Sequence, residues 1–125
     1  MKNTEDVYLE LSDKISEKES NKGIDSLSEK ERYFYLIDSL LMEVNNGGFD
    51  QYFSNSIGRH WEETVSILGK LGLVFLSNLV KRANEIFRSE KSEDNILDEL
   101  EELDDEFYEK LNYEETYEKV LTLFN

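Results

Sequence analysis

Apolar residues recur along the chain at the three- and four-residue spacing that is typical of amphipathic helices. The clearest case follows Ser28, which forms a capping-box pattern with Glu31 and so predicts a helix start. Behind it, the apolar positions on one helical face are Tyr33, Phe34, Ile37, Leu40, Leu41 and Val44. This helix is predicted to end near Val44, because Asn and Gly in the run 45–48 readily adopt the left-handed conformation that terminates helices.

Six other segments have helical periodicity. Thr4 is predicted to cap a first helix, which Asn21–Gly23 would stop and whose apolar stripe consists of Val7, Leu11 and Ile15. With a polar link over 89–95, the remaining helices are expected over about 49–53, 60–71, 73–87, 96–111 and 117–124. These elements predict an all-α fold, a compact irregular bundle of about six or seven helices. A chain of this length has enough apolar surface for one core, so one domain is expected over residues 1–125.

The composition agrees with a helical fold around an apolar core, and it bears on the cellular compartment of the protein. Proline is absent, while apolar residues make up 38% of the chain and aromatic residues 12%, so helix breakers are missing and a core can be built. There is no cysteine, which excludes disulfides, zinc-thiolate sites and thiol catalysis. No apolar run of signal-peptide length follows the first residues, and no stretch approaches the roughly 20 apolar residues of a membrane span. A cytoplasmic protein is therefore expected.

Acidic residues are concentrated in the last third of the sequence. The formal net charge is −15, and residues 90–118 alone hold fourteen acids against two lysines. The acids are predicted to point outward, because one helical face of this segment is taken by Ile96, Leu100, Leu103, Phe107 and Leu111. Such a charge repels nucleic acid and anionic lipid and attracts cationic surfaces, so the expected partner is a basic protein surface rather than DNA or a membrane.

The spacing of these charges suggests a more specific role. Eight acids lie between Asp98 and Glu109, one per about 2.2 Å of helix axis, against one per about 1.7 Å in duplex DNA. This density favours a face that substitutes for a row of phosphates, although an acidic face can also serve only to keep a protein soluble. The residues predicted to bind the partner are Asp98, Glu99, Glu101, Glu102, Asp105, Glu106 and Glu109.

Few residues are suited to catalysis or to metal binding. His60 is the only histidine. With Glu62 or Glu63 it would suit acid–base chemistry, but a histidine that caps or packs at a helix start is the simpler interpretation. A di-metal carboxylate bundle needs paired Glu-x-x-His motifs, and an EF-hand needs alternating ligands around a glycine, which the leucine spacing of the acidic segment contradicts. No catalytic residue, cofactor or metal is therefore predicted.

The most distinctive motif is Asn-Asn-Gly-Gly-Phe-Asp-Gln-Tyr-Phe-Ser-Asn, over residues 45–55. The two glycines allow a tight turn, and they lack the lysine of a phosphate loop. The aromatic residues are expected to fill the core, and the polar ones to hydrogen-bond exposed backbone groups. The residues predicted to form the fold in this way are Asn46, Gly47, Gly48, Phe49, Gln51, Tyr52, Phe53 and Asn55.

This motif resembles the signature of a family of bacterial all-helical domains named after DNA mimic protein nineteen. The helix before the motif, the turn over 68–72 and the segment 103–108 also resemble that family, so the similarity covers about residues 28–124. The resemblance implies an acidic, dimeric protein that occupies the DNA-binding surface of a transcription factor. Exposed apolar residues on so small a chain likewise favour a homodimer.

Two other functions stay open at this point. The same acidic face would block the basic active site of a toxin or nuclease, as an immunity protein or antitoxin does. A small ligand-binding domain or enzyme would instead use His60, Gln51, Tyr52 and Asn55. The prediction carried forward is an acidic binding protein, not an enzyme, that occupies a basic and DNA-binding surface of a partner protein.

Overall fold

Six α-helices account for most of residues 2–125, the part of the chain that the computed structural model describes. Three short 3₁₀ segments, η1 (Ile24–Ser26), η2 (Ser56–His60) and η3 (Thr122–Phe124), join or follow them. The helices are α1 (Thr4–Lys22), α2 (Glu29–Ser54), α3 (Trp61–Lys70), α4 (Val74–Phe87), α5 (Glu93–Lys110) and α6 (Tyr113–Leu121). The prediction of an all-α bundle of six or seven helices is confirmed.

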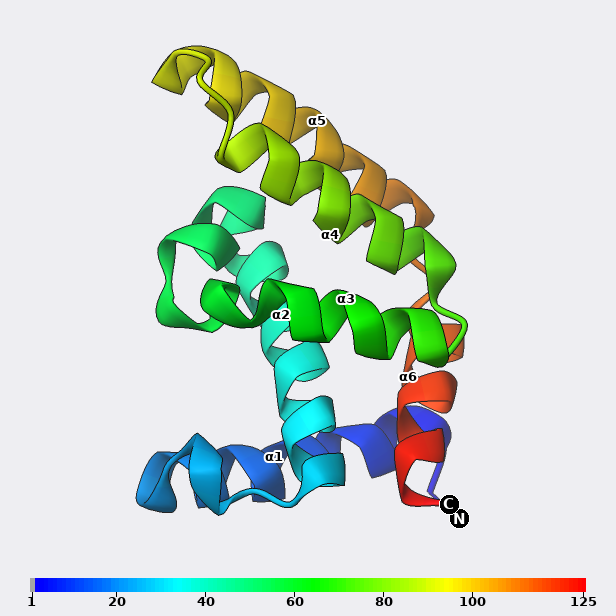
Figure 1. Cartoon of the computed structure of the whole chain (residues 1–125). Helices are drawn as coiled ribbons and strands as arrows, with labels where there is room; N and C mark the ends of the chain where they lie inside the picture. Colours follow the sequence, from blue (N-terminus) through cyan, green and yellow to red (C-terminus); the bar gives the residue numbers. More distant parts are fainter. Residues whose placement is uncertain (1) are drawn as a thin grey trace.

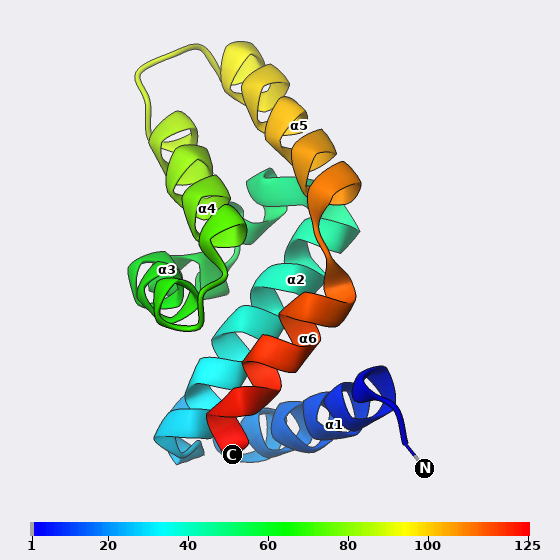
Figure 2. The same ribbon diagram turned by 90° about the vertical axis from the view of Figure 1, so that its right-hand side faces the viewer.

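Helix α2 is the central element, and it packs against α1, α3, α4 and α5. Helix α1 crosses its N-terminal end, and α4 and α5 form an antiparallel pair over its C-terminal end (Figure 1). Helix α6 returns from α5 to α1 and runs beside α2 (Figure 2). Side chains from all six helices contribute to one buried apolar cluster, so the acidic helix α5 is part of the core rather than an appendage.

The predicted start of α2 is confirmed. Ser28 accepts a hydrogen bond from the backbone N–H of Glu31, and the Glu31 carboxylate accepts one from the backbone N–H of Ser28. Behind this capping box, five of the six predicted apolar positions are buried: Phe34, Ile37, Leu40, Leu41 and Val44.

The predicted apolar stripe of α1 is wrong in part. Val7 is 41% exposed, whereas its neighbour Tyr8 is buried and stacks on Tyr117 of α6 with a centroid distance of 4.0 Å. Tyr8 and Ile15 are therefore the buried positions of this helix. The N-cap is also different, because Asn3 rather than Thr4 accepts the hydrogen bond from the backbone N–H of Asp6.

A break in α2 lies at Gly47 and Gly48, three and four residues after Val44 and within the run 45–48 that was expected to end the helix. The backbone of Gly48 has φ +77° and ψ −177°, and Gly47 has φ −153° and ψ 18°, so the helix stops and restarts in a new direction. The restarted segment buries Phe49, Tyr52 and Phe53, as predicted from their aromatic character.

The polar groups freed by this break are bonded by α5. The backbone N–H of Phe49 donates to Asp104 Oδ1 at 2.8 Å, and Tyr108 Oη donates to the carbonyl oxygen of Val44 at 2.8 Å. Each α5 residue thus serves one helix terminus that the break creates, since the first N–H groups and the last carbonyls of a helix have no partner within it. These two hydrogen bonds fix the position of the acidic helix α5 relative to the break in α2.

Asn46, Gln51 and Asn55 bond other side chains rather than the backbone groups that the sequence suggested. Gln51 Nε2 and Asn55 Nδ2 both donate to Glu43 Oε2, at 2.9 and 2.7 Å, and Asn46 Nδ2 donates to Gln51 Oε1. Gln51 and Asn55 lie one turn apart, so the change of direction at Gly48 brings both within reach of the segment before the break. These bonds tie the two parts of α2 together.

A buried carboxylate joins α1 to α2. Asp38 is only 6% exposed and accepts hydrogen bonds from Tyr8 Oη at 2.9 Å and from Ser12 Oγ at 2.6 Å. Burial raises its pKa, and the two hydroxyl donors oppose that rise. None of the ion pairs among residues 2–125 involves this carboxylate.

We predict that Gly48→Ala destabilises the protein by about 1 kcal/mol or more, because alanine strains the positive φ and its Cβ would collide with the Asp104 carboxylate. The free energy of unfolding is measured by urea denaturation. Gly69→Ala is the matched control, since Gly69 lies in α3 with open space around a Cβ, and alanine there is expected to stabilise by about 0.5 kcal/mol. Equal stability of the two variants would contradict this account of the break.

Thermal stability is predicted to rise as the pH falls from neutral towards the raised folded pKa values of two buried carboxyls. Burial raises the pKa of both Asp38 and Asp104 above the ordinary 3.8, so the folded state binds these protons more readily and gains stability as the pH falls through the folded pKa values. Below about 4.5 the trend reverses. The pKa of Glu31 is lowered by the backbone N–H of Ser28 and by Lys18, and that of Glu63 by Arg32, so the stability from these groups is lost there.

The measurement is the melting temperature at constant ionic strength across this pH range. Protonation at lower pH also reduces the net charge of −15, and the weaker repulsion raises the melting temperature as well. The series is therefore repeated at about 0.5 M salt, which screens exposed charges far more than buried ones. A melting temperature that falls steadily from pH 7 to pH 5 at both salt concentrations would show that the two buried carboxyls do not control this range.

Candidate partner-binding surface

Helix α5 separates its apolar and acidic residues onto opposite sides. Leu100, Leu103 and Phe107 are buried against α2 and α4. Six exposed acids fall within an arc of about 100° on the other side, at the helical spacing of 100° per residue. These residues, called here the acidic stripe, are Asp94, Asp98, Glu101, Glu102, Asp105 and Glu109.

Two of the residues predicted to bind a partner lie beside the stripe and carry a cation of the same chain. Glu99 pairs with Lys91, with nitrogen–oxygen distances of 2.6 and 2.8 Å, and Glu106 pairs with Arg82 of α4 at 2.9 Å. Lys91 and Arg82 partly neutralise these two carboxylates. The other five predicted residues, all in the stripe, form no ion pair with any residue in the described part of the chain.

The density of available charge is therefore lower than the sequence indicated. Of the eight acids between 98 and 109, Glu99 and Glu106 are paired and Asp104 faces the break in α2. The six acids of the stripe span sixteen residues, or one charge per about 4 Å of axis. A single DNA strand carries one phosphate per about 3.4 Å. The stripe thus compares with one phosphate strand and not with the whole duplex.

Sequence reasoning misplaced two acids of α5. Asp94 was assigned to a polar link, but Ser92 caps the helix by accepting a hydrogen bond from the backbone N–H of Asn95, so α5 begins at Glu93. The signal was present, since a serine followed by acidic residues is a typical helix start. Asp104 was counted with the outward acids, and only the fold reveals its contact with Phe49, 55 residues away in sequence.

Asp104 carries an energetic cost that its hydrogen bond offsets. Burial raises its pKa, the backbone N–H of Phe49 lowers it, and the neighbouring Asp105, Glu101 and Asp50 raise it further. The Asp104 carboxylate also lies beside the N-terminus of the restarted segment of α2, where the positive end of the helix dipole stabilises a negative charge. Asp104 therefore fixes how α5 packs against α2, but it is not one of the stripe residues.

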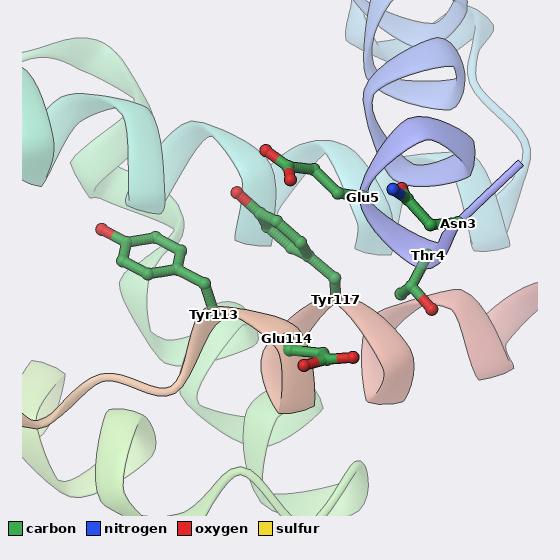
Figure 3. A pocket seen from close by; sticks show the side chains of 6 residues that line it. All are labelled: Asn3, Thr4, Glu5, Tyr113, Glu114 and Tyr117. Atoms are coloured by element: carbon green, nitrogen blue, oxygen red, sulfur yellow. The ribbon is translucent and has the colours of Figure 1, made fainter.

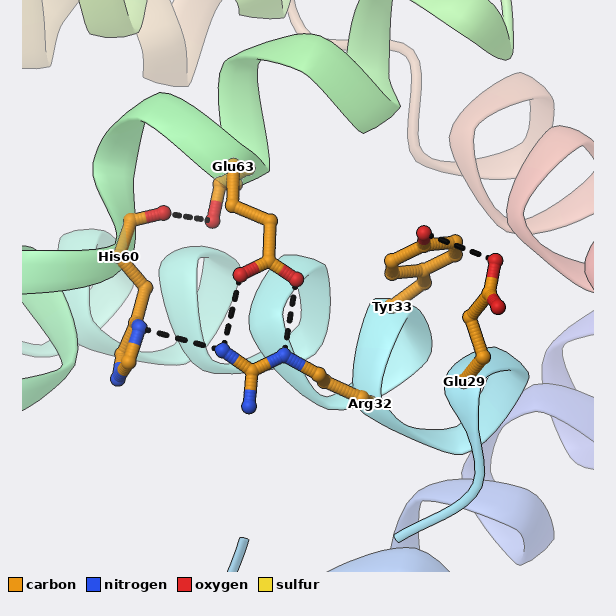
Figure 4. A network of polar contacts seen from close by, with 6 residues as sticks. Glu29, Arg32, Tyr33, His60 and Glu63 are labelled. Carbon is orange, nitrogen blue, oxygen red and sulfur yellow. Dashed lines mark hydrogen bonds and ion pairs between the residues drawn. The ribbon is translucent and has the colours of Figure 1, made fainter. Parts of the chain in front are cut away.

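His60 belongs to a different cluster, in which an arginine binds a glutamate (Figure 4). Arg32 donates to both carboxylate oxygens of Glu63 at 2.8 Å, and its Nη2 lies 3.5 Å from His60 Nδ1. The hydrogen bonds from Arg32 lower the pKa of Glu63, so this carboxylate is a fixed anion rather than a proton donor. His60 is the N-cap residue of α3 but makes no capping hydrogen bond with its side chain; of the two expected roles, capping or packing at a helix start, its half-buried ring against Arg32 agrees with packing.

The residues of the alternative ligand-binding hypothesis do not share one cavity. His60 faces Arg32, Asn55 bonds to Glu43, and Tyr52 is fully buried. Gln51 lines the surface groove between α1, α2 and α6, and it shares the Glu43 carboxylate with Asn55. The hydroxyl of Tyr52 is a buried polar atom without a hydrogen-bond partner in the described chain. The surroundings of these four residues therefore favour packing roles over a common site.

Within residues 2–125, no group of three or more histidine, aspartate or glutamate residues is arranged to hold a metal ion. Among the helices described here, none is both long enough and apolar enough to cross a membrane.

We predict that Asp104→Ala destabilises the protein by about 1–2 kcal/mol, because it leaves the buried N–H of Phe49 without an acceptor. Asp105→Ala is the control: it removes the same side chain from the next residue, which is exposed, and should change the free energy of unfolding by less than about 0.5 kcal/mol. Urea denaturation measures both. If the two variants were equally stable, the contact between α5 and the break would not contribute to folding.

Comparison with known proteins identifies the family. A family model described as DMP19-like protein matches residues 25–124, which is close to the 28–124 expected from the motif. Neither the curated proteins nor the solved structures contain a match to this chain. Because the matched region holds the broken helix, the acidic helix and most of the core, the chain belongs to the family of DMP19-like proteins.

Proposed function

We propose that this protein acts as a DNA mimic: its acidic stripe occupies the DNA-binding surface of a partner protein and so excludes DNA from that surface. The family name points to this class of function. The observation that carries the proposal is the stripe itself, six exposed carboxylates on one helix that form no ion pair with any of residues 2–125.

The physical basis is electrostatic complementarity. DNA-binding surfaces carry lysine and arginine at positions that match the phosphate spacing, and the stripe presents carboxylates at a comparable spacing. The helix is packed on the core along its opposite face, so presenting these charges requires little ordering upon binding. A high negative charge also steers the encounter with cationic surfaces.

This proposal includes three further expectations from the sequence. The partner is a protein and not nucleic acid, since phosphates and carboxylates repel each other. The role is binding rather than catalysis. A cytoplasmic homodimer is also proposed, and exposed apolar residues of α4 such as Val74 and Phe75 support self-association.

We predict that replacing Glu101, Glu102 and Asp105 by Gln, Gln and Asn weakens partner binding at least tenfold, about 1.4 kcal/mol. All three are exposed and off the apolar face of α5, so the variant should fold normally. The control replaces three exposed acids elsewhere, Glu17, Glu62 and Glu118, by Gln. It removes the same total charge and should change the affinity by less than about threefold.

The bait is the immobilised protein in nuclease-treated lysate of its own host, with bound proteins identified by mass spectrometry. The wild-type and control baits should retain a DNA-binding protein that the stripe variant loses. The affinity of that purified protein is then measured at about 0.15 M salt, where the Debye length is roughly 8 Å, and duplex DNA should compete for it. If the stripe variant bound its partner unchanged, the stripe would serve only to keep the protein soluble. Inhibition of a captured toxin or nuclease would support the immunity-protein alternative.

A further inference from the structure

A groove outside the acidic stripe has a chemical character that the stripe lacks. It lies between α1, α2 and α6, has a volume of about 670 Å³, and includes Tyr113 and Tyr117 in its lining. A second hollow of about 620 Å³, at the start of α1, shares the same two tyrosines. The two hollows share this pair of tyrosines in their lining and are together called here the tyrosine groove. None of the stripe residues lines it.

The two rings form the aromatic wall of the groove. Tyr113 and Tyr117 lie side by side on α6, with a centroid distance of 5.9 Å and hydroxyls pointing the same way, and Glu5 of α1 reaches towards Tyr117 (Figure 3). Tyr117 also stacks on the buried Tyr8, which fixes its ring. Both tyrosines are only partly buried, so a ligand can contact their faces. Aromatic faces of this kind attract cations.

Negative charge surrounds these rings without any matching cation. The lining residues include five carboxylates and, in the described chain, no lysine, arginine or histidine. Among residues 2–125, Glu5, Asp13 and Glu114 are exposed and form no ion pair, while Asp38 at the buried edge accepts from neutral hydroxyl donors. The remaining carboxylate is Glu43, which accepts from two neutral amides. The groove is therefore complementary to a cation.

Apolar side chains complete the lining next to the charges. Leu9 of α1 is 47% exposed and Met42 of α2 is 59% exposed, and both border the groove. Exposed apolar residues beside an acidic aromatic wall would be unfavourable for a ligand that is only a charge, such as a free metal ion. They suit a ligand that is cationic at one end and apolar at the other.

We propose that the tyrosine groove binds an arginine side chain of a partner protein, with an apolar neighbour of that arginine against Leu9 and Met42. Arginine fits better than lysine because its planar guanidinium stacks on aromatic rings and binds carboxylates through two parallel hydrogen bonds. This contact is a recognition site separate from the acidic stripe, so it stands whether or not the stripe mimics DNA.

The probe is the peptide acetyl-Gly-Arg-Leu-Gly-amide, titrated into the full chain and followed by NMR. The largest shifts are expected at Tyr113 and Tyr117. The same peptide with citrulline in place of arginine keeps the shape but loses the charge, and should bind roughly tenfold more weakly. Equal affinity of the two peptides would overturn the proposal.

The matched variants separate the groove from the overall charge. Replacing Glu5, Asp13 and Glu114 by Gln, Asn and Gln should weaken the arginine peptide about fivefold, whereas the stripe variant at 101, 102 and 105 should change it by less than about twofold. Both must show wild-type circular dichroism. Equal weakening by the two variants, or shifts centred on α5, would mean that the peptide senses only net charge. Concentration-dependent shifts of Tyr113 and Tyr117 without peptide would show that a second copy covers the groove, which also overturns the proposal.

Discussion

The structure depends on one reciprocal contact, in which the acidic helix bonds the broken ends of the central helix. At Gly47 and Gly48 the backbone of α2 leaves the helical conformation, which frees a carbonyl before the break and an N–H after it. Tyr108 and Asp104 of α5 satisfy these two groups. Buried backbone groups without partners are costly. The break is therefore stable only when α5 places Asp104 and Tyr108 opposite these two groups. The same register fixes which side of α5 faces solvent, and so which acids form the stripe.

Local signals in the sequence were enough to predict that the helices exist, but not all of their bounds, since α5 begins at Glu93 and α6 at Tyr113, both earlier than expected. The capping box at Ser28 and Glu31 acts within one turn, and the positive φ at Gly48 follows from the absence of a Cβ at a helix end. Contacts between distant segments were not predictable in the same way. Nothing near Asp104 indicates that it turns inward, because its acceptor role depends on a backbone N–H that is 55 residues away.

The choice of buried face illustrates the same limit in α1. Val7 and Tyr8 are adjacent, and both are apolar enough to join a helical stripe with Ile15. The stacking of Tyr8 on Tyr117 and its hydrogen bond to Asp38 decide the rotation of the helix, and Val7 is left exposed. Likewise, the pairing of Glu106 with Arg82 requires the antiparallel arrangement of α4 and α5. Periodicity gives the elements and a charge count, whereas tertiary partners decide how much of that charge is available.

The stripe is compatible with a stable helix because packing outweighs repulsion. Four pairs of stripe acids are four residues apart, at 94 and 98, 98 and 102, 101 and 105, and 105 and 109. Like charges at this spacing cost about 0.2–0.5 kcal/mol per pair, or about 1–2 kcal/mol in all. Burial of Leu100, Leu103 and Phe107 contributes about 1.5–3 kcal/mol for each side chain, which is several times larger. A cationic surface that binds the stripe removes the repulsion as well as adding contacts. Partner binding and the stability of α5 are therefore linked, and the repulsion stored in the free protein favours the bound state.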